Sequence, residues 1–289
     1  MLRTLRMNHE DIVNSLFETN DYDHNNFMPE STSKFNIDQY NKNQSFHKKD
    51  ISYGWINYLK YEYPNRADNA KKILEKNSVS SFINAIKVHN NAKPVSLDIG
   101  CATCRYPLWL SNMGFHAVGY DINDTALEIC QQVAKNNPNI EIKKKNILES
   151  DFVVDQFSLV TCMMGTFNHI SRNGHNRFVE WIYKSLKKDG SFIFSTWNIK
   201  GIFTNYLYFY SSEEKEYIKE NTLSLNELSN LLEKHGFKIN NIEPICFFPD
   251  QCYEEWVLSE SKIIEIDVIA KSLLDRKNSQ MSVIHVVKQ

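Results

Sequence analysis

Residues 94–105 read Pro-Val-Ser-Leu-Asp-Ile-Gly-Cys-Ala-Thr-Cys-Arg, and this stretch decides the fold. A mostly apolar run ends at Asp98-Ile99-Gly100, which is typical of a buried strand that stops at a tight turn. A helix is expected from there to about Asn112, because Pro107 is tolerated if it lies in the first turn of the helix. The stretch therefore predicts a strand, a glycine turn and a helix in succession.

Strands and helices continue to alternate after this helix. Further strands are predicted over 115–121, 140–144, 157–163, 191–197, 237–242 and 282–288, and helices over 123–136, 176–188 and 263–274. Another helix is expected to begin at Ser224, where Ser-Leu-Asn-Glu has the form of a capping box. Such alternation predicts an α/β fold with a doubly wound, mainly parallel seven-stranded sheet and helices on both faces.

The N-terminal third of the chain differs from this pattern. Residues 1–92 are predicted to form a loose arm and a helical cap or lid, with a long helix over about 66–89. Residues 93–289 are predicted to form the second domain, with an aromatic insertion at 198–222 and a helical insertion at 245–280. The sequence thus predicts one ligand-binding domain enclosed by added segments.

Composition limits the classes of function. The chain has 289 residues, with 33 Lys and Arg against 35 Asp and Glu, so its net charge of −2 makes a nucleic-acid partner unexpected. No apolar stretch reaches the roughly 18 residues that a membrane span needs, and no apolar segment follows the first arginines as in a secretory signal. Six cysteines are too sparse for a disulfide framework, which favours a cytoplasmic location.

The turn after the first strand indicates which ligand it binds. The dinucleotide motif G-x-G-x-x-G fails, since Ala102 and Arg105 stand at its later glycine positions. Asp98, two residues before Gly100, is a poor neighbour for a pyrophosphate but suits a ligand with a positive centre. Asp121 ends the second strand and is well placed to accept hydrogen bonds from two ribose hydroxyls.

Two stretches, VSLDIGCATCRYPLWL and GFHAVGYDIND, resemble the first two motifs of the class I S-adenosylmethionine-dependent methyltransferases. The resemblance continues through Lys145-Asn146-Ile147, FSLVTCMMGTFNHI, LKKDGSFIFSTWN and LSLNELSNLLEKHGF, in the family's order. It covers roughly residues 94–244 and the final strand. It implies S-adenosyl-L-methionine as cofactor, S-adenosyl-L-homocysteine as product and methyl transfer as the activity.

The resemblance also implies roles for individual residues. Asp98 would hold the methionine ammonium of the cofactor, and Asp121 would bind the ribose. The other cofactor-binding positions lie at the ends of the first four strands. Gly100, Cys101 and Ala102 would let the backbone approach the cofactor, and Ile122, Asn146 and Ile147 would contact the adenine. Cys162 and Met163 would line the floor of the site near the sulfonium.

Ala102 and Cys104 depart from the family pattern, which usually has glycine at both positions. A β-carbon there disfavours positive φ, so cofactor binding could be weaker, or the chain could be a non-catalytic relative that binds the cofactor without turnover. Cys101 and Cys104 also form a C-x-x-C, which leaves a redox pair open. No metal site is expected, because no second cysteine pair has the spacing of a zinc ribbon.

The fourth-strand motif favours a small-molecule acceptor. Residues 163–169 read Met-Met-Gly-Thr-Phe-Asn-His, which resembles small-molecule O- and N-methyltransferases, in place of an Asn-Pro-Pro-Tyr motif. His169 is the candidate general base, although it could instead cap the following helix. Asn168, Trp197 and Tyr210 are candidate acceptor-binding residues, the last two within an aromatic run that could equally pack an insertion.

These observations predict methyl transfer to an oxygen or nitrogen of a small molecule, with an oligomeric state that the residues leave open. The alternatives are methylation of RNA or of a protein side chain, and the non-catalytic binding module. Near-neutral charge and an enclosed site argue against the first alternative, whereas Ala102 and Cys104 are the only support for the second.

Overall fold

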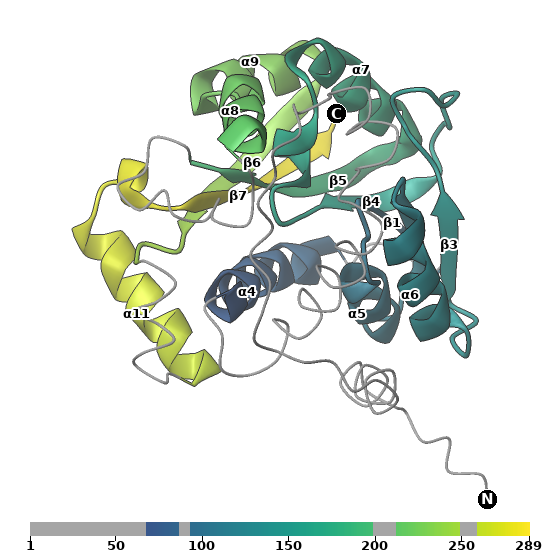
Figure 1. Ribbon diagram of the computed structural model, residues 1–289, viewed down its shortest axis with the longest axis horizontal. Helices are drawn as coiled ribbons and strands as arrows, with labels where there is room; N and C mark the ends of the chain where they lie inside the picture. The colour runs from purple at the N-terminus through teal and green to yellow at the C-terminus, as the bar shows by residue number, and fades with distance from the viewer. Residues whose placement is uncertain (1–67, 87–92, 199–211, 249–258) are drawn as a thin grey trace, which may run out of the picture.

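A computed structural model describes residues 68–86, 93–198, 212–248 and 259–289 (Figure 1). The seven strands of its sheet are β1 (Val95–Ile99), β2 (His116–Asp121), β3 (Ile140–Lys144), β4 (Phe157–Cys162), β5 (Leu186–Trp197), β6 (Phe237–Ile245) and β7 (Met281–Lys288). Their order across the sheet is β3-β2-β1-β4-β5-β7-β6. Among these strands β7 runs antiparallel to both of its neighbours, β5 and β6, and the other four pairs are parallel. The predicted fold class is confirmed.

The order of the strands creates a switch point between β1 and β4. From β1 the chain first moves outward to β2 and β3, then returns across the sheet to β4 and continues to β5. Connections on the two sides of this point leave in opposite directions, and in such sheets ligands bind at the carboxyl edge beside the switch point. This edge is where the predicted site residues gather.

Helices cover both faces of the sheet (Figure 1). The α-helices are α4 (Asp68–Ile86), α5 (Arg105–Asn112), α6 (Asp124–Ala134), α7 (Arg172–Ser185), α8 (Ser212–Asn221), α9 (Leu225–Lys234) and α11 (Glu260–Leu273), and short 3-10 helices are η2 (Thr166–His169) and η4 (Arg276–Asn278). Apolar residues of α4, α5 and α11 share one core cluster, and those of α7 and α9 share another on the opposite face. Within the described ranges no helix is long and apolar enough to cross a membrane.

The helix predicted over 176–188 ends earlier and starts earlier than expected. α7 begins at Arg172 and ends at Ser185, and β5 begins at once with Leu186. Asp189 adopts a φ of 62°, and the pairing of β4 with β5 shifts register at this point. Lys187 and Lys188, which the sequence pattern places at the end of a helix, therefore lie in a bulged, solvent-exposed part of β5.

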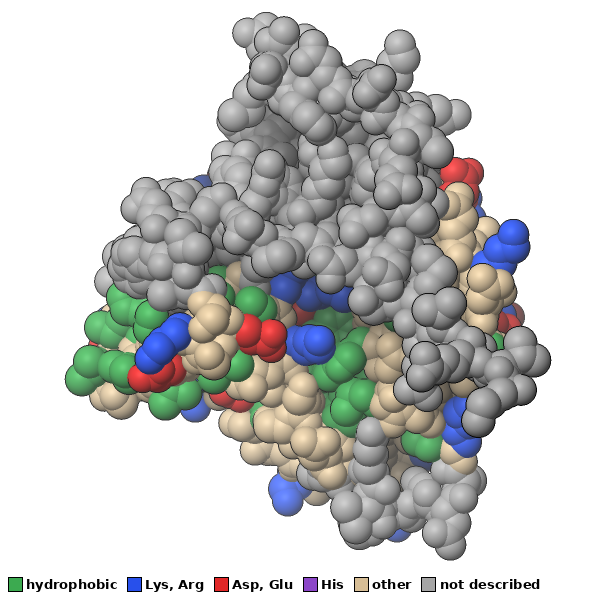
Figure 2. All heavy atoms as spheres, turned by 90° about the horizontal axis from the view of Figure 1, so that it is seen from below, with side chains coloured by type: hydrophobic (Ala, Val, Ile, Leu, Met, Phe, Trp, Pro, Cys, Tyr) green, Lys and Arg blue, Asp and Glu red, His purple; other side chains and the backbone are tan. Residues whose placement is uncertain are grey.

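The predicted cap and insertions are described only in part. Residues 1–67 lie outside the described part, while α4 packs directly on the sheet, with Phe82 stacked on His285 of β7 at 5.1 Å. α8 lies within the predicted aromatic insertion, and α11 lies within the helical one. The outer side of α11 exposes Val268, Ile269 and Leu273, and Figure 2 shows hydrophobic side chains gathered over this helix.

Candidate cofactor and acceptor site

The turn after β1 keeps a left-handed backbone although two of its glycines are replaced. Gly100, Ala102 and Cys104 have φ values of 74°, 44° and 80°. A left-handed conformation costs a residue with a β-carbon roughly 1–2 kcal/mol. The amides of Gly100 and Cys101 both donate to the carbonyl of Tyr120, at 2.8 and 3.1 Å, and so tie the turn to the end of β2. The chain thus retains the turn geometry at an energetic cost.

Gly100 also lets the turn lie against the segment after β4. A β-carbon at Gly100 would be 2.5 Å from Cγ2 of Thr166, a distance at which the two atoms overlap. The turn after β1 and the segment after β4 therefore meet directly at the switch point. Any larger residue at this position would push them apart.

Asp121 organises the same turn from the end of β2. One carboxylate oxygen accepts a hydrogen bond from the amide of Ala102 at 2.8 Å. The other accepts from the amides of Ile122 and Asn123, at 2.7 and 2.9 Å. Burial raises the pKa of Asp121, whereas these three backbone donors oppose the rise. Asp121, the residue predicted to bind the ribose, thus holds the turn after β1 in place.

Asp98 is a buried acid at the end of β1. It is 3% exposed, and the hydroxyl of Thr161 on β4 donates to its Oδ1 at 2.6 Å. Burial raises the pKa of Asp98 from 3.8 to about 7, although the Thr161 hydrogen bond and nearby Arg105 oppose the rise. A positive group bound beside this carboxyl would favour its ionised form. The position suits the ammonium of an amino-acid ligand.

Glu75 of α4 is a site residue that the sequence analysis did not identify. Its side chain is fully buried, and it accepts hydrogen bonds from Arg105 and Tyr106 on one oxygen, at 3.2 and 3.0 Å. The other oxygen accepts from the amide of Met164 at 2.8 Å and the hydroxyl of Ser195 at 2.7 Å. One signal was present, since Glu75 lies seven residues before Phe82, two helical turns along the buried face.

The segment after β4 is folded against β5. Gly165 has a φ of 75°, and a β-carbon there would lie 2.1 Å from Nε1 of Trp197. Trp197 is 6% exposed, and Lys71 lies 5.5 Å from its ring centroid. This candidate acceptor residue therefore packs against the backbone of the segment after β4 at Gly165. Tyr210, the other aromatic candidate, lies outside the described residues.

Asn168 and His169 differ in their surroundings. Asn168 is fully buried, and its amide nitrogen donates to the hydroxyls of Thr196 and Thr222 at 3.1 and 2.8 Å. Its oxygen accepts from the amide of Trp197 at 3.0 Å, so the side chain joins η2, β5 and the end of α8. The side chain of His169 is half-buried, and burial lowers its pKa from 6.5 to about 4.

The remaining predicted residues lie around the same edge. Ile122 and Asn146 are half-buried at the ends of β2 and β3, and Ile147 is buried beside them. Cys162 and Met163 are buried at the end of β4. The structure thus places every described candidate at the carboxyl ends of β1 to β5, in the arrangement that the strand order requires.

The cysteines of the turn form a buried thiol cluster. Sγ of Cys101 lies 4.0 Å from Sγ of Cys130 on α6, and both are free thiols, as is Cys104. A hydrogen bond with Cys130 lowers the pKa of Cys101, but burial and the nearby Asp121 raise it, to about 11 overall. Such thiols are weakly nucleophilic. In the described ranges no three His, Cys, Asp or Glu side chains are grouped to hold a metal.

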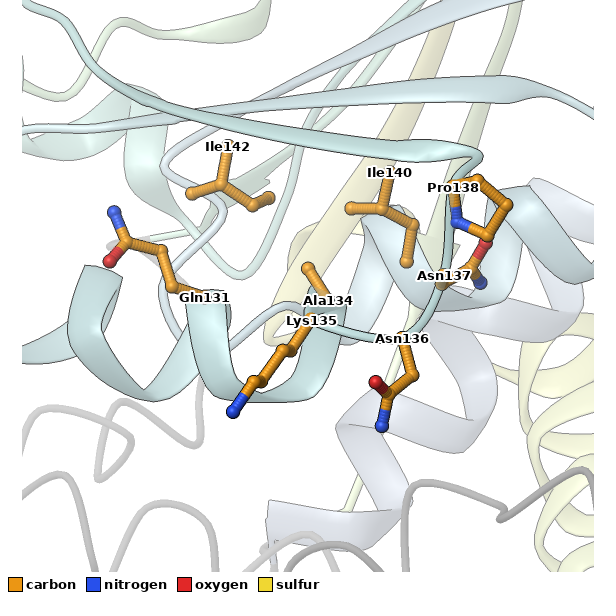
Figure 3. A pocket seen from close by; sticks show the side chains of 8 residues that line it. All are labelled: Gln131, Ala134, Lys135, Asn136, Asn137, Pro138, Ile140 and Ile142. Carbon is orange, nitrogen blue, oxygen red and sulfur yellow. The ribbon is translucent and has the colours of Figure 1, made fainter.

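An open hollow of about 480 Å³ lies at the other end of β3 (Figure 3). Its lining comes from the end of α6 and the start of β3: Gln131, Ala134, Lys135, Asn136, Asn137, Pro138, Ile140 and Ile142. None of the candidate site residues lines it. The candidate residues therefore lie at the carboxyl edge and not at this hollow.

Comparisons with known proteins agree with this geometry. Residues 97–190 match a family model described as a methyltransferase domain. A curated protein of Geobacillus sp. (strain WCH70), named "Putative methyltransferase GWCH70_2453", is 30% identical over 127 residues, which are 42% of this chain and 51% of that protein. The chain thus spans about half the length of this curated relative.

Solved structures show the same fold at low identity. Phosphoethanolamine N-methyltransferase 2 of Haemonchus contortus, in complex with S-adenosyl-L-methionine, has a TM-score of 0.57 and 17% identity, over 90% of this chain and 61% of that one. An S-adenosylmethionine-dependent methyltransferase of Mesorhizobium loti has a TM-score of 0.52 and 14% identity, over 72% and 96% of the two chains.

The sheet order and these solved structures together define a class I methyltransferase fold. Residues 97–190 match the methyltransferase domain in sequence, and the solved structures share the fold. The family resemblance read from the sequence is thereby confirmed.

Proposed function

We propose that this chain transfers a methyl group from S-adenosyl-L-methionine to an oxygen or nitrogen of a small-molecule acceptor. The main support is one arrangement: Asp98 and Asp121 end two neighbouring strands and flank a turn held at positive φ. The H. contortus enzyme of the same fold was solved with this cofactor. The order of the motifs along residues 97–190 adds to this support.

The residues present fit the cofactor. Asp98 is a buried acid whose ionised form a cationic ligand would favour, and we assign it the ammonium of the methionine end. Asp121 would accept the ribose hydroxyls, with Ile122, Asn146 and Ile147 against the adenine. When bound, the cofactor supplies a methyl group activated by its sulfonium. The protein aligns the acceptor, excludes water and removes a proton where needed.

His169 is the proposed proton acceptor. Burial lowers its pKa to about 4, so the imidazole is neutral at pH 7 and has a lone pair to receive a proton. The neighbouring Asn168 is held by three hydrogen bonds and would act by fixing η2, rather than by reaching the acceptor. Met163 and Trp197 are buried in the same core cluster, and we place them beside the acceptor.

Calorimetric titration with S-adenosyl-L-methionine and S-adenosyl-L-homocysteine tests the proposal. We expect micromolar binding of both, lost in Asp121→Ala and kept in Asp124→Asn, because Asp124 is exposed and paired with Lys144. Thermal unfolding of Asp121→Ala checks that the variant is still folded. Absence of binding by the wild-type chain would refute the proposal, and binding would justify a screen of phenols and aromatic amines as acceptors.

A further inference from the structure

A single acid of α4 joins three segments of the proposed site. The four donors to the Glu75 carboxylate come from the start of α5, the segment after β4, and β5. Burying a carboxylate is costly unless it is paired and hydrogen-bonded, and these four donors meet that need. Glu75 therefore sets the relative positions of α5 and the β4 segment.

Arg105 is the charged partner of Glu75 and is the first residue of α5, directly after the turn that follows β1. Its Nη2 is 3.2 Å from Oε1 of Glu75, and its side chain is still 22% exposed. Arg105 and Glu75 both lie near enough to Asp98 to affect its ionisation. Two acids and one guanidinium thus lie within electrostatic range of one another near the end of β1. An amino-acid group, with its adjacent ammonium and carboxylate, matches Asp98 and Arg105 in charge.

We propose that Glu75 is a positioning residue for the amino-acid end of the cofactor: it holds the Arg105 guanidinium beside Asp98, so that Arg105 receives the cofactor carboxylate while Asp98 receives its ammonium. This inference rests on the proposed function. It assigns to α4, which lies outside the matched residues 97–190, a part in cofactor binding that acts through Arg105. Arg105 suits the task because a guanidinium binds carboxylates with directional hydrogen bonds.

Two ligands separate this role from mere structural support. S-adenosyl-L-homocysteine has the amino-acid end, whereas 5′-methylthioadenosine has the adenosine and thioether but lacks that end. We expect Glu75→Gln to weaken binding of S-adenosyl-L-homocysteine at least tenfold and to change binding of 5′-methylthioadenosine less than twofold. Glu265→Gln, at an exposed residue paired with Lys262, is the matched control and should change neither affinity.

A double-mutant cycle tests whether Glu75 acts through Arg105. If it does, Glu75→Gln/Arg105→Gln should bind S-adenosyl-L-homocysteine as weakly as Arg105→Gln alone, since effects within one network are not additive. Arg105 is partly exposed, so Arg105→Gln keeps the selective loss measurable even if Glu75→Gln fails to fold.

Three outcomes would overturn the inference and leave the proposed function standing. The first two are an equal loss of affinity for both ligands in Glu75→Gln and an unchanged affinity for both in that variant. The third is that Arg105→Gln loses no more affinity for S-adenosyl-L-homocysteine than for 5′-methylthioadenosine. Binding of neither ligand by the wild-type chain would instead refute the proposed function, and the inference with it.

Discussion

Replacing Asp98 by Asn should raise the free energy of unfolding of the ligand-free protein, and this gain over wild type should grow as the pH rises. The folded pKa of about 7 lies above the unfolded value of 3.8. Folding therefore binds a proton at Asp98, and the stability of the wild-type chain falls as pH rises from about 4 to 7. An uncharged Asn can still accept the hydrogen bond from Thr161 and does not pay the cost of ionisation.

The expected magnitude follows from the two pKa values. The cost of ionising Asp98 in the folded state approaches roughly 4 kcal/mol above pH 7, since one pKa unit is about 1.4 kcal/mol. At pH 5.5 the raised pKa lowers the free energy of unfolding by only roughly 2 kcal/mol, because the carboxyl is still protonated in the folded state and ionised in the unfolded state. Between pH 5.5 and 8.0, the advantage of Asp98→Asn over wild type should therefore grow by about 2 kcal/mol.

Urea unfolding, followed by tryptophan fluorescence at both pH values without cofactor, measures this difference. Comparing the two proteins cancels the contribution of the buried histidines, which ionise alike in both. Asp124→Asn is the control and should follow wild type, because Asp124 is exposed. Equal pH dependence in wild type and Asp98→Asn would refute the reasoning. The same substitution should lower S-adenosyl-L-homocysteine affinity at least tenfold, through loss of a charge-assisted hydrogen bond.

Three further outcomes are expected. Ala102→Gly should raise the free energy of unfolding by about 0.5–1 kcal/mol, because the relief at φ 44° exceeds the entropy that glycine adds to the unfolded chain; a loss in urea unfolding would contradict this. Asn168→Ala should lower the free energy of unfolding by about 3 kcal/mol, because its buried partners would be left without hydrogen bonds. An unchanged melting temperature would contradict a stabilising role for these hydrogen bonds. If His169 is the base, kcat should fall only as pH drops through about 4, and His169→Ala should abolish turnover while cofactor binding persists; a limb near 6.5 would argue against it.

The alternation of strands and helices could be predicted because it is a local property. Each strand is a short buried run and each helix has an apolar stripe, so neighbouring residues alone indicate the element. The same holds for the turn at Gly100 and for Asp98 and Asp121, since parallel strands bring their carboxyl ends to one edge wherever they lie in the order. The end of α7 was misjudged because Lys187 and Lys188 suit a helix end as well as an exposed strand, and pairing with β4 decides between them.

Only the tertiary structure shows the contacts between residues that are far apart in the sequence. Glu75 and Ser195 are 120 residues apart, and no local pattern shows that a helix acid meets a strand hydroxyl and the amide of Met164. Asn168 and Trp197 likewise depend on contacts between η2 and β5. The sequence by itself determined the fold class and the positions of Asp98 and Asp121 at the carboxyl ends of neighbouring strands, through periodicity and position along the chain. Only packing decided which polar groups are buried together, because the cost of burying a charge is offset by partners that the chain supplies from elsewhere.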